Sequence, residues 1–187
     1  MRNLIFKSTM LLLSTVLFFS CKKDNKPEPK QEEVATKNIG GGIIETYQRQ
    51  PNGTSVVFSN WIQKTDADWM TWGSYKWTTD MNTSSLTEAV RDKGLVLVYF
   101  NFNNYLGQLP HTGLGENLMF DYHFQTGIIT ARYTYGGGSV AGSILNIKLR
   151  YILIPASSLS GVNGKMMNNT IDYRDYNAVC DYYNIPK

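Results

Sequence analysis

The stretch L-M-F-D-Y-H-F-Q-T-G-I-I-T-A-R-Y-T-Y, residues 118–135, carries the strongest structural pattern in the chain. Apolar and polar side chains alternate on both sides of Thr126-Gly127, and this period of two is that of a β-strand with one buried face. The Thr-Gly pair between the two runs is typical of a tight turn. The stretch therefore predicts an antiparallel hairpin with one face in a core and the other in solvent.

The remaining strand signals extend this hairpin into an all-β domain. Runs rich in apolar and β-branched residues at 55–62, 95–102 and 144–154 predict further strands, bounded by Gly, Pro and Asn turn residues. Residues 95–102 show little alternation, so we expect a central strand that is covered on both faces. In 144–154 the alternation predicts that Arg150 points outward. We expect a mainly antiparallel β-sandwich, with the jelly roll as one arrangement it could take.

Two short helices are expected at the periphery of the sandwich. Ser85 and Glu88 have the spacing of a capping box, and Gly94 is placed to end a helix of about two and a half turns. Near the C-terminus, Asp172 is the expected N-cap, and apolar residues follow it at spacing i, i+3, i+4 and i+7. That stripe places Cys180 against the sheet, which favours a buried structural thiol over a reactive one.

The first 20 residues are organised like a secretory signal. A positively charged start precedes an apolar run at 10–19, and Ser20 is the small residue directly before Cys21. The apolar run is about half as long as the roughly 20 residues that a membrane-spanning helix needs. We therefore expect residues 1–20 to be a signal peptide that is removed.

The residues at this junction, Leu17-Phe18-Phe19-Ser20-Cys21 followed by Lys-Lys-Asp, resemble the lipobox of bacterial lipoproteins from the Bacteroidota. The resemblance implies cleavage before Cys21 and acylation of that cysteine with fatty acid such as palmitate. It also implies a membrane partner through the N-terminal lipid, in the cell envelope, as an outer-membrane lipoprotein that faces the periplasm or the surface. The alternative is an ordinary signal peptide in which the position of Cys21 is coincidental.

A flexible linker is expected at residues 21–42. Its part at 22–37 mixes both charges with two prolines and one large apolar side chain, so it buries too little surface to offset the entropy of folding. Gly40-Gly41-Gly42 reads as a hinge at the end of this linker. These features predict a single β-sandwich domain at residues 43–187.

Three runs in this domain, L-V-L-V-Y-F at 95–100, Y-I-L-I-P at 151–155 and D-Y-N-A-V-C-D-Y-Y-N-I-P at 175–186, resemble a group of secreted Bacteroidota proteins. No activity is assigned to that group. The resemblance therefore implies no catalytic residue, cofactor or ligand.

Charge and residue chemistry narrow the classes of function. Removal of the signal lowers the formal charge from +3 to +1 and no basic stripe follows, so we expect no nucleic-acid partner. Asp121 and His123 share a strand face, but no third metal ligand is identifiable beside them. We therefore expect no catalytic set, no metal and no cofactor. A hydrolase whose carboxylates converge only in the folded protein remains an alternative.

The aromatic cluster W-M-T-W-G-S-Y-K-W at residues 69–77 is the candidate binding site. As one strand over 69–79, it would place Trp69, Tyr75 and Trp77 on one face and Trp72 on the other. Exposed aromatic rings stack on sugars, whereas aromatics in strands are commonly packed in a core. We expect these four residues to bind a glycan or an envelope protein. The alternative is a structural or assembly lipoprotein in which they are all core.

Overall fold

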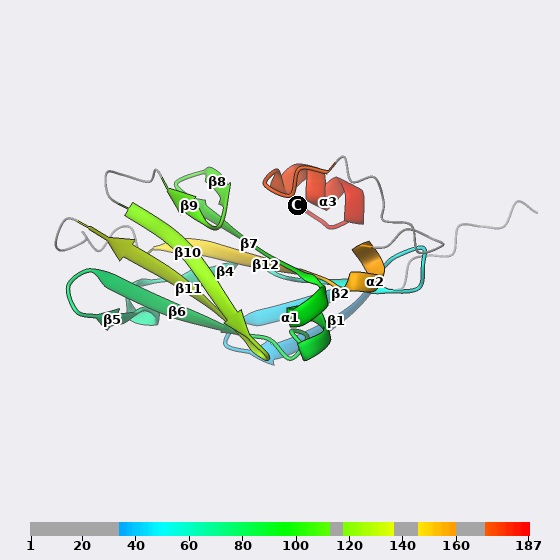
Figure 1. Cartoon of the computed structure of the whole chain (residues 1–187), viewed down its shortest axis with the longest axis horizontal. Helices are drawn as coiled ribbons and strands as arrows, with labels where there is room; N and C mark the ends of the chain where they lie inside the picture. Colours follow the sequence, from blue (N-terminus) through cyan, green and yellow to red (C-terminus); the bar gives the residue numbers. More distant parts are fainter. Residues whose placement is uncertain (1–33, 113–117, 137–145, 160–170) are drawn as a thin grey trace, which may run out of the picture. The chain divides into compact units, whose positions relative to one another are not determined.

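The computed structural model describes residues 34–112, 118–136, 146–159 and 171–187, which form two packed sheets (Figure 1). Within these residues the first sheet has seven strands, ordered β1 (Val34–Gly40), β2 (Ile43–Arg49), β3 (Ser55–Ser59), β12 (Ile147–Ile154), β7 (Leu95–Phe102) and β8 (Tyr105–Gln108), while β4 (Ile62–Lys64) pairs with β12 off this path. The second sheet has five strands, ordered β5 (Met70–Trp72), β6 (Lys76–Asn82), β11 (Ile128–Tyr135), β10 (Leu118–Gln125) and β9 (His111–Thr112). The predicted all-β sandwich is confirmed.

Short helices complete the described part of the chain. They are α1 (Glu88–Lys93), α2 (Ala156–Leu159) and α3 (Tyr176–Tyr183), with a 3-10 turn at Asp66–Asp68. The predicted helix before Gly94 is present, with Gly94 as its C-cap, but Thr87 is the N-cap and its side chain accepts from the Val90 amide. The last helix likewise begins later than expected, because Asp175 rather than Asp172 caps it.

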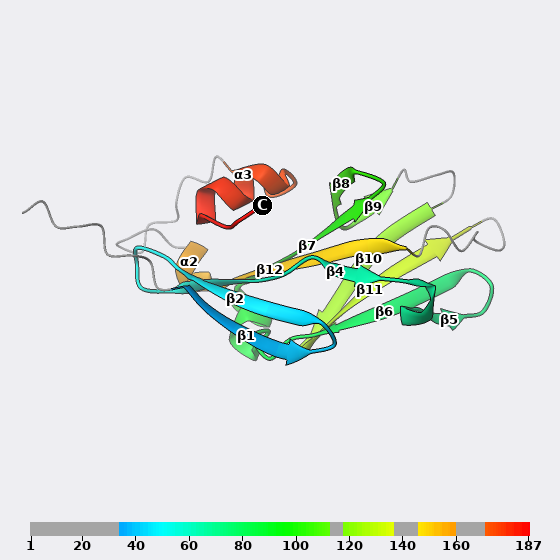
Figure 2. The same cartoon turned by 180° about the vertical axis from the view of Figure 1, so that it is seen from behind.

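The central strands of the first sheet, β7 and β12, are covered on both faces. The inner face of this sheet packs against the second sheet in a core that includes Phe100, Phe120 and Tyr133. Its outer face packs against α3, where Cys180 is 1% exposed, and burial raises the pKa of this thiol. The buried position of Cys180 is confirmed. Figure 2 shows the sandwich from behind, with α3 over β7 and β12.

Coverage by α3 explains why one expectation about β12 is wrong. Arg150 was expected to point into solvent, but it is 4% exposed in the layer under α3. Its Nε donates to the Ser59 carbonyl at 2.9 Å, and its Nη1 donates to the Pro186 carbonyl at 2.8 Å and to the Tyr176 hydroxyl. Arg150 therefore ties the C-terminal segment to the sheet.

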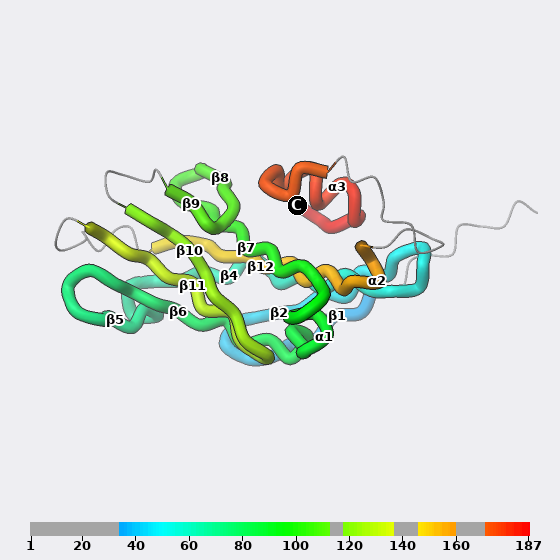
Figure 3. The backbone as a smooth tube through the Cα atoms, in the orientation of Figure 1, coloured from blue at the N-terminus to red at the C-terminus, as the bar shows by residue number. Residues whose placement is uncertain are grey.

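Strand order also corrects two details of the predicted sandwich. β7 is buried on both faces as expected, but it lies between β12 and the edge strand β8, so β12 is the more central strand. Runs of consecutive strands stay in one sheet, β1 to β4 in the first and β9 to β11 in the second, as the tube in Figure 3 traces. β6 lies beside β11, so β6 and β9 to β11 have the order of one Greek key, whereas β1 to β3 form a meander instead of the second Greek key of a jelly roll.

The predicted hinge is a hairpin turn. Gly40, Gly41 and Gly42 have φ angles of 92°, 60° and 75°, a region that glycine enters without strain, and they connect β1 to β2. The sandwich therefore includes β1 and begins at or before Val34, which corrects the predicted boundary at residue 43. Cys21 and the rest of 1–33 lie outside the described residues.

The β10–β11 hairpin is confirmed in register. Leu118 pairs with Tyr135 at one end, and Gln125 pairs with Ile128 next to the turn. Its inner residues join the core between the sheets, as the alternation predicts, except Phe124 near the turn, which is 36% exposed. Its outer residues belong to a sheet face over which no described helix packs. This uncovered face of the five-stranded sheet, here called the open face, is the part of the fold that concerns the candidate site.

Candidate functional site

A turn at Gly73 divides the aromatic cluster. Gly73 has a φ of 67°, and β5 ends before it while β6 begins at Lys76. A Cβ placed on Gly73 would lie 3.3 Å from Cε1 of Tyr75, so the Tyr75 ring packs across the turn. The expectation of one continuous strand over 69–79 is wrong. The reason is that a left-handed residue reverses the chain between the two halves of the cluster.

Two of the four expected binding residues are in the core. Trp69 is 8% exposed, with its ring centroid 6.1 Å from that of Phe120, and Trp77 is 9% exposed and 6.1 Å from Tyr133. Such tilted and edge-to-face arrangements are the preferred geometry of packed aromatic pairs. Trp69 and Trp77 therefore leave the candidate site, and their expected grouping with Tyr75 on one strand face is wrong.

The other two residues, Trp72 and Tyr75, are each 57% exposed. Trp72 lies on the open face, because it pairs with Lys76, whose neighbour Trp77 points into the core. The indole Nε1 donates a hydrogen bond of 3.0 Å to Oγ1 of Thr78, which is itself 5% exposed. The ring is thus exposed to solvent but held in one orientation.

A row of side chains crosses the open face at the level of Trp72. The strand register aligns one residue from each of the five strands, which are Trp72, Lys76, Thr134, Met119 and Thr112. Met119 is 40% exposed, so apolar surface lies toward both ends of the row. With neighbouring strands about 4.8 Å apart, Trp72 and Met119 are separated by roughly 14 Å. This row presents a ring, a cation and hydroxyl groups along one line.

The next row along the strands holds an ion pair. Arg132 donates to both carboxylate oxygens of Asp121, from Nε at 2.7 Å and from Nη2 at 2.6 Å. The hydrogen bond to Asp121 raises the pKa of Arg132. Bidentate pairing of this kind fixes both side chains and neutralises both charges.

The pairing of Asp121 bears on catalysis. Asp121 and His123 were considered as an acid–base pair or as part of a metal site, but the carboxylate is engaged by Arg132 instead. Asp80, on the same face, accepts a hydrogen bond of 2.7 Å from Thr130. In the described part of the chain, no group of three or more His, Cys, Asp or Glu side chains is placed to hold a metal ion.

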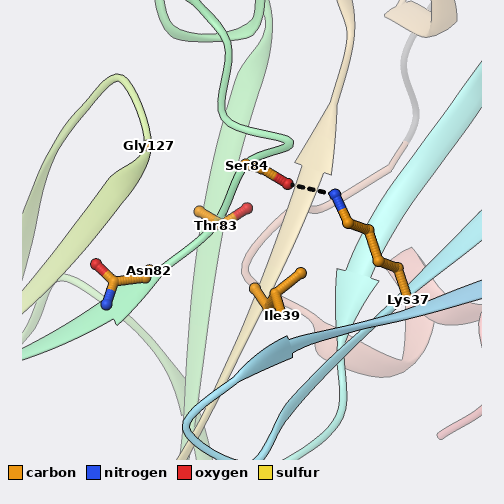
Figure 4. A pocket seen from close by; sticks show the side chains of 6 residues that line it. All are labelled: Lys37, Ile39, Asn82, Thr83, Ser84 and Gly127. Carbon is orange, nitrogen blue, oxygen red and sulfur yellow. Dashed lines mark hydrogen bonds between the residues drawn. The ribbon is translucent and has the colours of Figure 1, made fainter.

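A separate hollow of about 410 Å³ lies at the rim of the sandwich (Figure 4). Lys37 reaches from β1 toward the loop after β6, where its Nζ donates to Ser84 Oγ at 3.1 Å. The six residues around the hollow are Lys37, Ile39, Asn82, Thr83, Ser84 and Gly127. The sequence did not predict this hollow, because Lys37 and Ile39 lie in the range 21–42 that was expected to be a flexible linker.

Beside this hollow, a fully buried carboxylate is surrounded by hydroxyl groups. Oε1 of Glu45 accepts from the Tyr151 hydroxyl at 2.9 Å and from the Thr83 hydroxyl. Oε2 accepts from the Tyr47 hydroxyl at 2.9 Å and from the Ser85 hydroxyl at 2.7 Å. Glu45 is 0% exposed, so these four donors replace water. The cluster connects β2, β12 and the loop before α1. Its role is therefore structural.

The fold and the open face together define a class, a β-sandwich with one uncovered sheet that displays an oriented, exposed tryptophan. No protein-family model, curated protein or solved structure matches the chain. Across the described ranges, none of the helices has the length and apolar character to cross a membrane.

Proposed function

We propose that this chain is a lipid-anchored protein of the cell envelope whose sandwich binds carbohydrate on the open face. One observation carries the binding part, namely that Trp72 is 57% exposed while its indole is fixed by the bond to Thr78. A ring that is already ordered loses little entropy when a ligand stacks on it. The flat apolar face of an indole matches the apolar face of a pyranose ring, and solvent-exposed aromatic surface is typical of binding sites.

The neighbouring side chains on the open face are suited to the polar edges of a sugar. Thr134 and Thr112 belong to the same row as Trp72 and carry hydroxyl groups, and Lys76 carries a donor. Tyr75 adds a second exposed ring at the turn of the same hairpin. An extended sheet face with these groups fits a chain of sugar units better than a single small molecule.

The anchoring part of the proposal comes from the sequence. Cys21 stands directly after an apolar run and resembles the acylated residue of a lipobox. An anchored binding domain needs no catalytic residues, because the lipid attaches the protein to the membrane and the open face binds the ligand. Stable anchoring by lipid requires more than one acyl chain, which acylation of a lipoprotein cysteine supplies.

The alternative of a structural or assembly lipoprotein gains support from the burial of Trp69 and Trp77. It predicts that Trp72 and Tyr75 have no ligand. The hydrolase alternative gains none from the described residues of the open face, since Asp121 pairs with Arg132 and Asp80 accepts from Thr130.

A glycan array tests the proposal with the full chain in detergent micelles. The parent protein should bind at least one glycan, and Trp72→Ala should reduce that signal at least tenfold. Tyr182→Ala is the matched control, because Tyr182 is a 42% exposed aromatic residue on α3, which covers the other sheet. Binding that survives Trp72→Ala would contradict the assignment of the site to Trp72, and a parent that binds no glycan would favour the structural alternative.

A further inference from the structure

The cation beside Trp72 has no acidic partner among the described residues. Lys76 Nζ lies 5.7 Å from the centroid of the Trp72 ring, and the two residues are directly paired across β5 and β6. The ion pairs in the described part of the chain involve other cations, which are Arg91, Arg132, Arg174 and Lys187. Among the described residues, Lys76 therefore contacts the Trp72 ring and forms no ion pair.

Arg132 provides the contrast on the same face. It lies one row away from Lys76, on the adjacent strand, and Asp121 neutralises it through two hydrogen bonds. A third cation, Lys64, donates to the backbone carbonyl of Asp80 at 3.0 Å and interacts with the charges of Asp68 and Asp80. Of these three cations, Lys76 lies beside the Trp72 ring and has no ion pair with a described acid.

An unpaired cation next to a stacking ring selects ligands that carry a negative charge on or beside a sugar ring. A uronic acid has this chemistry, because its carboxylate extends from the edge of a pyranose whose face remains free to stack. We infer that the open face binds an acidic polysaccharide, whose uronate carboxylate pairs with Lys76 while its ring stacks on Trp72. This inference rests on the proposed carbohydrate binding and names the substrate class.

The contribution of the charge should be modest and sensitive to salt. Lys76 is partly exposed, and an ion pair at such a site changes affinity by about two- to fivefold. Repetition along a polymer would multiply this preference through multivalency. Salt at about 1 M should remove the preference, because the screening length then falls to about 3 Å.

The experiment compares uronate glycans with neutral glycans on the same array, using polygalacturonate, alginate and glucuronate-containing chains against cellulose, xylan backbone and laminarin oligomers. A matched pair, oligogalacturonate and its full methyl ester, then isolates the carboxylate in a titration. The full chain is tested beside Lys76→Gln, and beside Lys148→Gln as a control for loss of an exposed lysine on the first sheet.

The expected result is Trp72-dependent binding of uronates, with the acid about two- to fivefold tighter than its ester at low salt. Lys76→Gln should abolish that difference and Lys148→Gln should retain it. Trp72-dependent binding of neutral glycans without a preference for acids, or a preference that survives Lys76→Gln, would overturn the inference and leave the proposed function standing. Absence of any Trp72-dependent glycan binding would overturn both.

Discussion

The indole of Trp72 and the hydroxyl of Thr78 are joined by a hydrogen bond of 3.0 Å between β5 and β6. This bond satisfies a threonine that is 5% exposed and orients a tryptophan that is 57% exposed. A solvent-facing indole without a partner would sample several rotamers, and a ligand would have to order it. The pair thus links the packing of the hairpin to the proposed binding on the open face.

Tryptophans of the cluster should separate into two classes in unfolding experiments. Trp69→Ala and Trp77→Ala should each destabilise the protein by about 3–5 kcal/mol, because they remove buried rings from the core. Trp72→Ala should cost only about 1 kcal/mol, since it removes one hydrogen bond and little buried area. Denaturant unfolding measures all three. A neutral Trp77→Ala, or a Trp72→Ala protein that fails to fold, would contradict the arrangement of the hairpin.

The hydroxyl cluster around Glu45 gives a second stability prediction. Glu45→Gln should destabilise the fold by about 2 kcal/mol, because an amide replaces a carboxylate that accepts four hydroxyl donors. Tyr151→Phe deletes one donor and should cost less than Glu45→Gln. Chemical denaturation compares the two variants. Equal stability of Glu45→Gln and the parent would show that the carboxylate is not needed to connect these strands.

Alkaline pH should destabilise the sandwich through its tyrosines. Burial raises the pKa of seven described tyrosines above the usual value of 10, and the pKa of two of them, Tyr133 and Tyr176, to about 12; the others are Tyr47, Tyr99, Tyr122, Tyr151 and Tyr183. The pKa of each of these tyrosines is higher in the folded than in the unfolded protein. Their contribution to the free energy of unfolding is therefore complete below pH 10, and it is lost as the pH rises through the pKa values of the folded protein.

The free energy of unfolding should fall by on the order of 1 kcal/mol per fully buried tyrosine for each pH unit above 10. Burial lowers the pKa of Lys64, which acts in the opposite direction, but it is one group against seven. Unfolding midpoints between about pH 9 and about pH 11, with ultraviolet absorbance of tyrosinate as the second signal, measure the effect. A midpoint that stays constant while tyrosinate forms in the folded protein would contradict the assigned burial.

Lipid attachment at Cys21 makes a prediction that is independent of the sandwich. Cells expressing the parent chain should incorporate labelled palmitate into the protein, and Cys21→Ser should incorporate none, because the acylated thiol is absent. Cys180→Ser is the matched control, since Cys180 is buried and should carry no lipid. Label that persists in Cys21→Ser would place the acylation elsewhere, and a parent chain that incorporates no label would favour the ordinary signal peptide.

The alternation in 118–135 was sufficient to predict the β10–β11 hairpin and its inner and outer faces, because a period of two leaves one way to bury the apolar set. The segment 69–79 was mispredicted because Gly73 was read as a strand residue, whereas its positive φ makes it a turn. Likewise, the glycines at 40–42 were interpreted as a hinge, since nothing local distinguishes a hinge from a hairpin turn.

The site was harder to predict than the strands. The exposure of Trp72 depends on which sheet the helix α3 covers. The sequence around Trp72 does not indicate this tertiary contact. The same coverage buries Arg150, which local alternation placed in solvent. Lys76, Thr134 and Met119 joined the candidate site only through the register of four strands, although the alternation had already placed Thr134 and Met119 on the polar face of their hairpin.

The most direct test of binding on the open face is collisional quenching of tryptophan fluorescence by acrylamide, with and without the glycan that gives the strongest array signal. Trp72 is the most exposed of the four tryptophans, so a stacked sugar should shield it and lower the quenchable fraction in the parent. Trp61→Phe, which alters a half-buried ring that packs on Tyr176, should keep this protection, and Trp72→Phe should lose it. Glycan binding that leaves the quenching of the parent unchanged would contradict the account.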